Sequence, residues 1–161
     1  MDRLREHSVV LEGTVSQGRN VRLRPMTEDD WQILCKWNAD PQVLYYADGD
    51  DVGSRAPEEV RDIYRAVSQN AFCFIIELGG QPIGECWLQK MNLERILRNY
   101  SGLDCRRIDL TIGEKQYWGQ GIGTEVIRLL TEFGFSQQHA DILFGCDIAD
   151  YNPRSLRVFQ K

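Results

Sequence analysis

The stretch QYWGQGIGTE (116–125) carries the clearest chemical pattern in the sequence, because Gly119, Gly121 and Gly123 directly precede an apolar helical pattern. Glycine costs about 1 kcal/mol relative to alanine inside a helix, so three of them at a helix start need a reason. The first amides of a helix have no partner within it, and the helix dipole adds roughly half a positive charge there. Glycines let these amides approach phosphate oxygens without a Cβ in the way. The alternative is that the glycines only form a tight turn; we favour a phosphate site.

Two common nucleotide-binding loops do not fit this stretch. A P-loop requires GxxxxGK[ST], and no lysine follows these glycines. A Rossmann turn requires GxGxxG directly after the first strand, whereas the spacing here is GxGxG and several predicted strands precede it. The glycines therefore predict a phosphate site of another kind.

The composition limits the class of protein. The chain has 161 residues, 42% of them hydrophobic, which suits one folded domain with a substantial core. No apolar run approaches the roughly 18 residues of a membrane span, and the N-terminus does not resemble a signal peptide, so we expect no membrane partner. Five scattered cysteines without a CxxC pair, and only two histidines, predict neither a metal site nor a disulfide framework and favour the cytoplasm. The net charge of -5 disfavours nucleic acid and favours cationic partners.

The predicted elements alternate between strands and helices. Helical spacing predicts helices at 28–40, 56–69, 124–140 and 152–161, whereas 92–105 is either a short helix or a long loop. This order predicts a mixed α/β sheet with helices on both faces. The strands, recognised by alternation or by short apolar runs, are predicted at 8–15, 20–26, 71–78, 82–91, 106–113 and 141–149.

The glycine stretch, in this order of elements, resembles a known family. It matches the Q/R-x-x-G-x-G/A signature of the GNAT N-acetyltransferases, in which this loop wraps the pyrophosphate of acetyl-coenzyme A. The resemblance extends through LRPMTEDDWQILCKWNADPQV, GGQPIGECW, RIDLTIG and NPRSLRVFQK. It implies the GNAT fold: an α/β (α+β) arrangement with a mixed, mostly antiparallel twisted sheet, helices on both faces and strands splayed at the cofactor site. We expect a single acetyltransferase domain over 1–161 that lacks the family's last C-terminal strand or strands.

The resemblance also implies acetyl-coenzyme A as the cofactor. The backbone of Leu110 and Ile112 would pair with the pantetheine arm much as an added strand would. Later contacts near the thioester fall on Asn152 and Ser155, although Asn152 is equally well explained as the N-cap before Pro153. The residues placed around the diphosphate are Gln116, Gly119, Gln120, Gly121, Gly123 and Thr124.

The implied reaction is attack by a primary amine on the acetyl thioester, and the amine must first lose a proton. Asp109 lies in the middle of the strand RRIDLTIG, on the face opposite Ile108, Leu110 and Ile112. An acid in mid-strand, among residues that prefer burial, is costly without a use. We therefore predict that Asp109 is the catalytic base. The alternative is an ion pair with Arg106 or Arg107. Many family members supply a tyrosine as general acid where this chain has Phe159, so that acid is absent.

The chain also resembles the aminoglycoside 6'-N-acetyltransferases, in its opening LRPMTEDDW and in the aromatic and acidic loop YYADGDD. This resemblance implies a polycationic substrate, bound through ammonium–carboxylate pairs and stacking, and a role in antibiotic resistance. The loop is equally well explained as a solvated acidic segment. Glu85 and Trp87 are further pocket candidates, although tryptophan is more often core. The residues predicted to bind this substrate are Tyr46, Asp48, Asp109 and Asp147.

Other functions on the same fold stay open. The chain could acetylate a polyamine or a protein N-terminus. It could also bind coenzyme A without turnover, an option that Phe159 keeps open because it replaces the usual acid. The sequence leaves the oligomeric state open, a homodimer included.

Overall fold

A computed structural model describes residues 3–43 and 55–145. In this part of the chain, six strands form one sheet in the order β1-β2-β3-β4-β5-β6. Neighbouring strands are antiparallel except for the parallel pair β5 and β6, which confirms the predicted mixed, mostly antiparallel sheet. The strands are β1 Leu11–Val15, β2 Arg19–Pro25, β3 Ala71–Leu78, β4 Gln81–Lys90, β5 Cys105–Ile112 and β6 Ile142–Gly145. The helices are α1 Trp31–Asn38, α3 Pro57–Ser68, α4 Glu94–Asn99 and α5 Ile122–Ser136.

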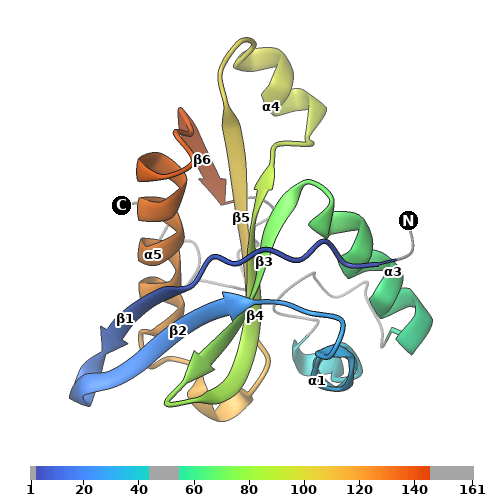
Figure 1. Cartoon of the computed structure of the whole chain (residues 1–161), viewed down its shortest axis with the longest axis vertical. Coiled ribbons are helices and arrows are strands. Elements are labelled where there is room, and N and C mark those ends of the chain that lie inside the picture. Colours follow the sequence, from blue (N-terminus) through green and yellow to red (C-terminus); the bar gives the residue numbers. More distant parts are fainter. Residues whose placement is uncertain (1–2, 44–54, 146–161) are drawn as a thin grey trace.

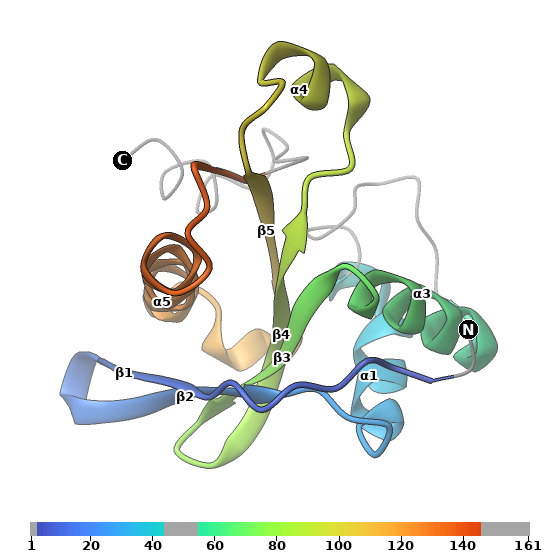
Figure 2. The ribbon, with the colours of Figure 1, turned by 45° about the horizontal axis from the view of Figure 1, so that its top comes forward.

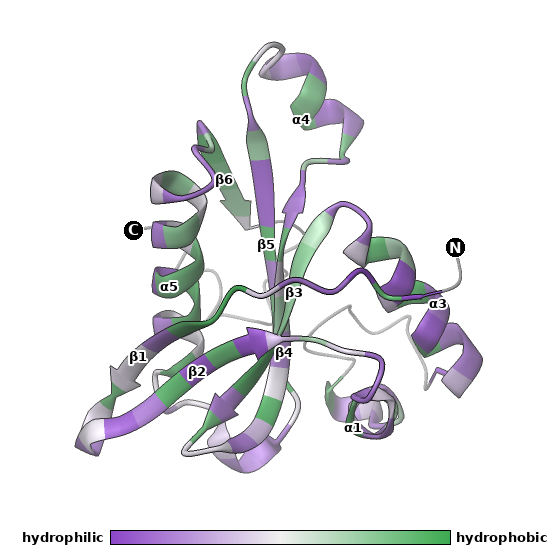
Figure 3. Cartoon of the chain, in the orientation of Figure 1, coloured by the Kyte–Doolittle hydropathy of each residue, from purple (hydrophilic) through white to green (hydrophobic). Residues whose placement is uncertain are grey.

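Helices cover both faces of the sheet (Figures 1 and 2). α5 packs on one face, where Val126, Leu130 and Phe133 meet the apolar side of the strands. α1 and α3 pack on the other face, through Leu34, Trp37 and further buried side chains. α5 is apolar toward the sheet and polar on its outer side, as its helical pattern predicts (Figure 3). α4 lies apart, at the far end of the long β4–β5 connection (Figure 1).

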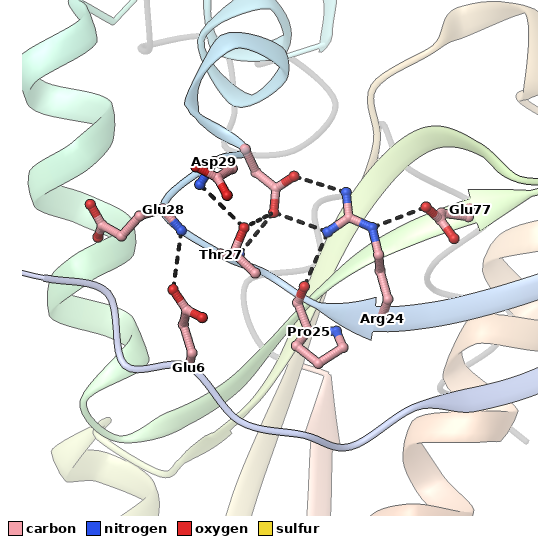
Figure 4. A network of polar contacts seen from close by, with 8 residues as sticks. Glu6, Arg24, Pro25, Thr27, Glu28, Asp29 and Glu77 are labelled. Carbon is pink, nitrogen blue, oxygen red and sulfur yellow. Dashed lines mark hydrogen bonds and ion pairs between the residues drawn. The ribbon is translucent and has the colours of Figure 1, made fainter.

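A network of polar contacts explains why α1 begins later than the predicted residue 28. Arg24 on β2 donates to both carboxylate oxygens of Asp30, at 2.8 and 3.0 Å, and to Glu77 on β3 at 3.0 Å (Figure 4). The same Asp30 carboxylate accepts the Thr27 amide at 2.8 Å. These contacts hold 27–30 in a turn, so the helix starts at Trp31.

The N-terminal segment is fastened to distant parts of the chain. The Leu4 amide donates to Glu28 at 2.6 Å, and the Arg5 amide donates to the Ser68 hydroxyl at 2.8 Å. His7 Nε2 donates to the Cys73 carbonyl at 2.8 Å. The segment thereby crosses from the α3 side of the sheet to β1 (Figure 1).

Other predicted boundaries shift as well: β1 begins at Leu11 rather than at 8, and α5 ends at Ser136 rather than at 140. α5 begins at Ile122 rather than at 124, so Gly123 lies in its first turn, and the ambiguous segment 92–105 contains the short helix α4. β6 is described to Gly145, while the predicted helix at 152–161 lies outside the described residues.

Candidate cofactor and acceptor site

The glycine turn joins the end of β5 to the start of α5. Gly119 and Gly121 have φ of 77° and 81°, in the left-handed region that favours glycine. A Cβ added at Gly121 would meet nothing within 4 Å, so the space beside this residue is open. A Cβ at Gly123 would make only an ordinary contact, at 3.7 Å from Leu110 Cδ1. Packing within the chain therefore does not explain the bare backbone at either position.

The glycine turn leads into the N-terminal end of α5, whose first amides have no acceptor within the helix. The first α-helical hydrogen bond of α5 runs from the Glu125 amide to the Gly121 carbonyl at 3.2 Å. The amides that come before Glu125 in the helix, including those of Gly123 and Thr124, have no acceptor within the helix. No side chain caps this end at Gly121. With the dipole of a 15-residue helix behind them, these amides form a site suited to an anion.

Side chains fix the shape of the turn. The Trp118 indole donates to the Ile112 carbonyl at 2.7 Å, and Gln120 Nε2 donates to the Gln116 carbonyl at 2.8 Å. Arg19 on β2 donates to the other side-chain atom of Gln120, Oε1, at 2.8 Å. The side chain of Gln120 thus holds the backbone at Gln116, and both residues were predicted for this site, whereas Arg19 was not.

β5 carries the residues predicted to pair with the pantetheine arm. Its described pairing with β6 covers only the first four residues, up to the pair of Ile108 and Gly145. Leu110 and Ile112 lie beyond that pair, and their side chains pack against the core beneath α5. The second half of β5, after Ile108, therefore lies beyond the described pairing with β6 and leads into the glycine turn.

The face of the sheet opposite α5 carries a cluster of polar side chains. Adjacent pairs on β4 and β5 are Glu85 with Thr111, Trp87 with Asp109, and Gln89 with Arg107. Glu85 is only 4% exposed, and Trp87 packs against the core beneath α1 and α3. A buried carboxylate is costly unless it is compensated or has a function, which makes this face the candidate acceptor site. We call these six residues the polar face.

Asp109 is held by the neighbouring arginine, as one interpretation of the sequence anticipated. Arg107 Nε and Nη2 each donate to one oxygen of Asp109, both at 2.9 Å. Arg107 Nη1 donates to Asn92, just before α4, at 3.0 Å. A bidentate guanidinium stabilises the carboxylate anion. The ion pair that was the alternative to a catalytic role is therefore present, and the role of Asp109 as the base stays a prediction.

The other groups near the site are less suited to covalent or proton chemistry. Burial, with a smaller effect of the Glu85 charge, raises the pKa of the Cys73 and Cys86 thiols, so neither is a reactive thiolate. Burial also acts to raise the pKa of Glu114, but hydrogen bonds from Trp37 at 2.6 Å and Lys36 at 2.9 Å outweigh it and lower that pKa.

The part of the chain that matches known proteins contains both the glycine turn and the polar face. Residues 20–161 match the family model of the acetyltransferase (GNAT) domain. The chain belongs to the GNAT acetyltransferase family. A curated relative, the uncharacterized N-acetyltransferase p20 of Bacillus licheniformis, is 26% identical over 119 residues. The match covers 71% of this chain and 62% of that relative, so this GNAT chain spans less than two thirds of the relative's length.

Solved structures share the GNAT fold with this chain. An acetyltransferase (GNAT family) from Bacillus anthracis superposes with a TM-score of 0.70 at 17% identity, covering 94% of this chain and 81% of that one. The aminoglycoside acetyltransferase AAC(6')-Ib, solved with ribostamycin and coenzyme A, superposes with a TM-score of 0.67 at 22% identity, covering 87% of this chain and 80% of that one. At these identities the likeness establishes the fold.

Several residues predicted for the GNAT site lie outside the described part of the chain. In 3–43 and 55–145, no group of three or more histidine, cysteine or acidic side chains could hold a metal ion. No helix in these two ranges is long and apolar enough to cross a membrane. The predicted residues that fall outside them are Tyr46, Asp48, Asp147, Asn152 and Ser155, together with Phe159.

Proposed function

We propose that this GNAT chain binds acetyl-coenzyme A at the glycine turn and acetylates a primary amine of a cationic small molecule, most specifically the 6'-amine of an aminoglycoside. The observation that carries the proposal is the open left-handed turn at Gly121, which leads directly into the first amides of α5, whose N–H groups have no acceptor within the helix. Family membership and the fold shared with AAC(6')-Ib support the chemistry. The described cysteines are all free thiols, which supports a cytoplasmic site of action.

The polar face would receive the amine. Asp109, whose ionised form Arg107 stabilises, binds the substrate ammonium. Glu85 is buried on the adjacent strand and lies on the same face of the sheet as Asp109, so Glu85 is assigned the proton that the amine must lose. The free amine nitrogen would then form the N–C bond to the acetyl carbonyl as the C–S bond breaks. Coenzyme A would leave as its thiolate, which takes up the second proton that the nitrogen loses on becoming an amide. The proposal thereby gives Glu85 the role that the sequence suggested for Asp109.

Cofactor binding is tested first, by calorimetry with acetyl-coenzyme A. Gly121→Asp places a carboxylate where the diphosphate would bind, and we expect it to abolish measurable binding. Gly102→Asp is the matched control, because Gly102 also has a positive φ, at 84°, and open space for a Cβ, but lies far from the turn. A folded Gly121→Asp variant that binds as tightly as the wild type would contradict the site.

The roles of the two carboxylates are separated by steady-state kinetics. Glu85→Gln should lower kcat by about 10²- to 10⁴-fold, the usual contribution of acid–base catalysis, with little change in KM. Asp109→Asn should raise KM for the amine more than it lowers kcat. The opposite result would return the base to Asp109.

The substrate class is decided by competition between a kanamycin-type aminoglycoside, spermidine and a peptide with a free N-terminus. We expect the aminoglycoside to be acetylated with the highest kcat/KM, and its apparent affinity to fall with salt. Preference for spermidine or the peptide would keep the fold and chemistry but change the substrate. Tight cofactor binding without turnover on any amine would indicate a module that binds coenzyme A only.

A further inference from the structure

The segment that leads into β1 runs antiparallel to α5 and past its N-terminal end. His7 stacks edge-on against Phe72, which in turn contacts Phe133 in the C-terminal half of α5. Farther along the segment, Gly13 lies beside the first turn of α5, so close that an added Cβ would overlap Glu125 Oε2. The tip of the β1–β2 hairpin therefore extends beyond the N-terminal end of α5 (Figure 1).

Arg19 reaches from this tip to the glycine turn. Arg19 pairs with Val15 at the hairpin end, and its Nη1 donates to Gln120 Oε1 at 2.8 Å. Its remaining hydrogen bonds go to the Ser16 carbonyl at 3.2 Å and the Ser16 hydroxyl at 3.4 Å. Gln120 itself lies between the two left-handed glycines of the turn. A guanidinium is thus held at the mouth of the site by neutral oxygens alone.

The neighbouring cations are already neutralised. Lys115 forms an ion pair with Asp40 at 2.9 Å, and Arg128 forms one with Glu125 at 2.8 Å. Among the described basic side chains around the turn, Arg19 is the one without a carboxylate partner. A guanidinium binds phosphate oxygens more strongly than amide oxygens, because those hydrogen bonds are charge-assisted and can be bidentate.

We propose that Arg19 is a phosphate-binding residue of the cofactor site, contributed by the β1–β2 hairpin. The inference rests on the proposed binding of coenzyme A at the turn. Gln120 positions the guanidinium before the cofactor arrives, and a phosphate oxygen then becomes its partner. Coenzyme A offers two sources of such an oxygen, the diphosphate and the 3'-phosphate of the ribose.

The test measures affinities for coenzyme A and for dephospho-coenzyme A, which lacks the 3'-phosphate, by calorimetry. Arg19→Gln should weaken coenzyme A binding by about five- to tenfold, and Arg19→Lys, which keeps the charge but not the planar fork, should lose less. Arg22→Gln is the control, since it removes the same charge from the exposed outer part of the same strand, where Arg22 lies 4.0 Å from Glu12. It should bind within twofold of the wild type.

The two ligands identify the phosphate. A loss that persists with dephospho-coenzyme A assigns Arg19 to the diphosphate, whereas a loss seen only with coenzyme A assigns it to the 3'-phosphate. A folded Arg19→Gln variant that binds both ligands as the wild type does overturns the inference and leaves the proposed function intact. A folded wild-type chain that binds neither ligand contradicts the proposed function, and this inference with it.

Discussion

Glu28 joins the N-terminal segment to two helices, and replacing it with glutamine gives a quantitative prediction. Its carboxylate accepts the Leu4 amide at 2.6 Å, Arg65 at 2.7 and 3.2 Å, and the Trp31 indole at 3.3 Å. The side chain is 14% exposed. The Arg65 hydrogen bonds, helped by the Leu4 amide and against the effect of burial, lower the pKa of Glu28 to about 2.

The size of the effect follows from this pKa. A fall from 4.5 to about 2 corresponds to about 3 kcal/mol of stability from the ionised form, at about 1.4 kcal/mol for each pKa unit. Because the pKa is lower in the folded state, this contribution is complete above pH 4.5 and is lost as the pH falls toward 2. At pH 3.5 the unfolded chain has already taken up the proton while the folded chain has not, and about 1.4 kcal/mol is gone.

The assay is urea unfolding of the wild type and of Glu28→Gln at pH 7 and pH 3.5. We expect the variant to be less stable by about 2–3 kcal/mol at pH 7, and the difference to shrink by about 1.4 kcal/mol at pH 3.5. Glu58→Gln, at an exposed position in the first turn of α3, is the control and should change stability by less than about 0.5 kcal/mol. An equal difference at both pH values would refute the reasoning, since the charge would then contribute nothing.

Three further predictions concern the site and its support. Gly113→Ala should lower stability by about 1–3 kcal/mol in urea unfolding, because its Cβ would overlap the Trp37 ring. Arg107→Met should raise KM for the amine several-fold in the acetyl-transfer assay, and a double-mutant cycle with Asp109→Asn should show coupling above about 0.5 kcal/mol; additive effects would contradict the pair. Glu114→Gln should destabilise more at pH 7 than at pH 4, because the lowered pKa of Glu114 makes its contribution present above the ordinary value and lost below it.

The sequence predicted the elements whose signals are local. β3 matches the predicted 71–78 to the residue, because its apolar run has the length of a strand, is rich in aromatic and β-branched residues and ends at a glycine turn. The turn at Gly121 was also predictable, since its requirement is a backbone conformation that glycine favours. The choice between Arg106 and Arg107 as the partner of Asp109 was also predictable. Side chains alternate between the two faces of a strand, so Arg107 shares the face of Asp109 and Arg106 does not.

Features that depend on tertiary contacts were not predictable. The start of α1 is set by Arg24, which bonds Asp30 from a different strand. The pairing of Trp87 with Asp109, which aligns the polar face, depends on the β4–β5 register, and a connection containing a helix does not fix that register in advance. Arg19 was missed for the same reason, because its partner Gln120 is 101 positions away.

The bond between His7 and Cys73 has a consequence for synthesis on the ribosome. The two residues are 66 positions apart, so translation at about 5–20 residues per second leaves the N-terminal segment without this partner for about 3–13 s. During that interval the β1–β2 hairpin can close locally, whereas His7 must wait for β3 to emerge. Docking of the segment on β3 therefore follows closure of the hairpin, and a nascent chain arrested before Cys73 should leave residues 3–9 open to protease.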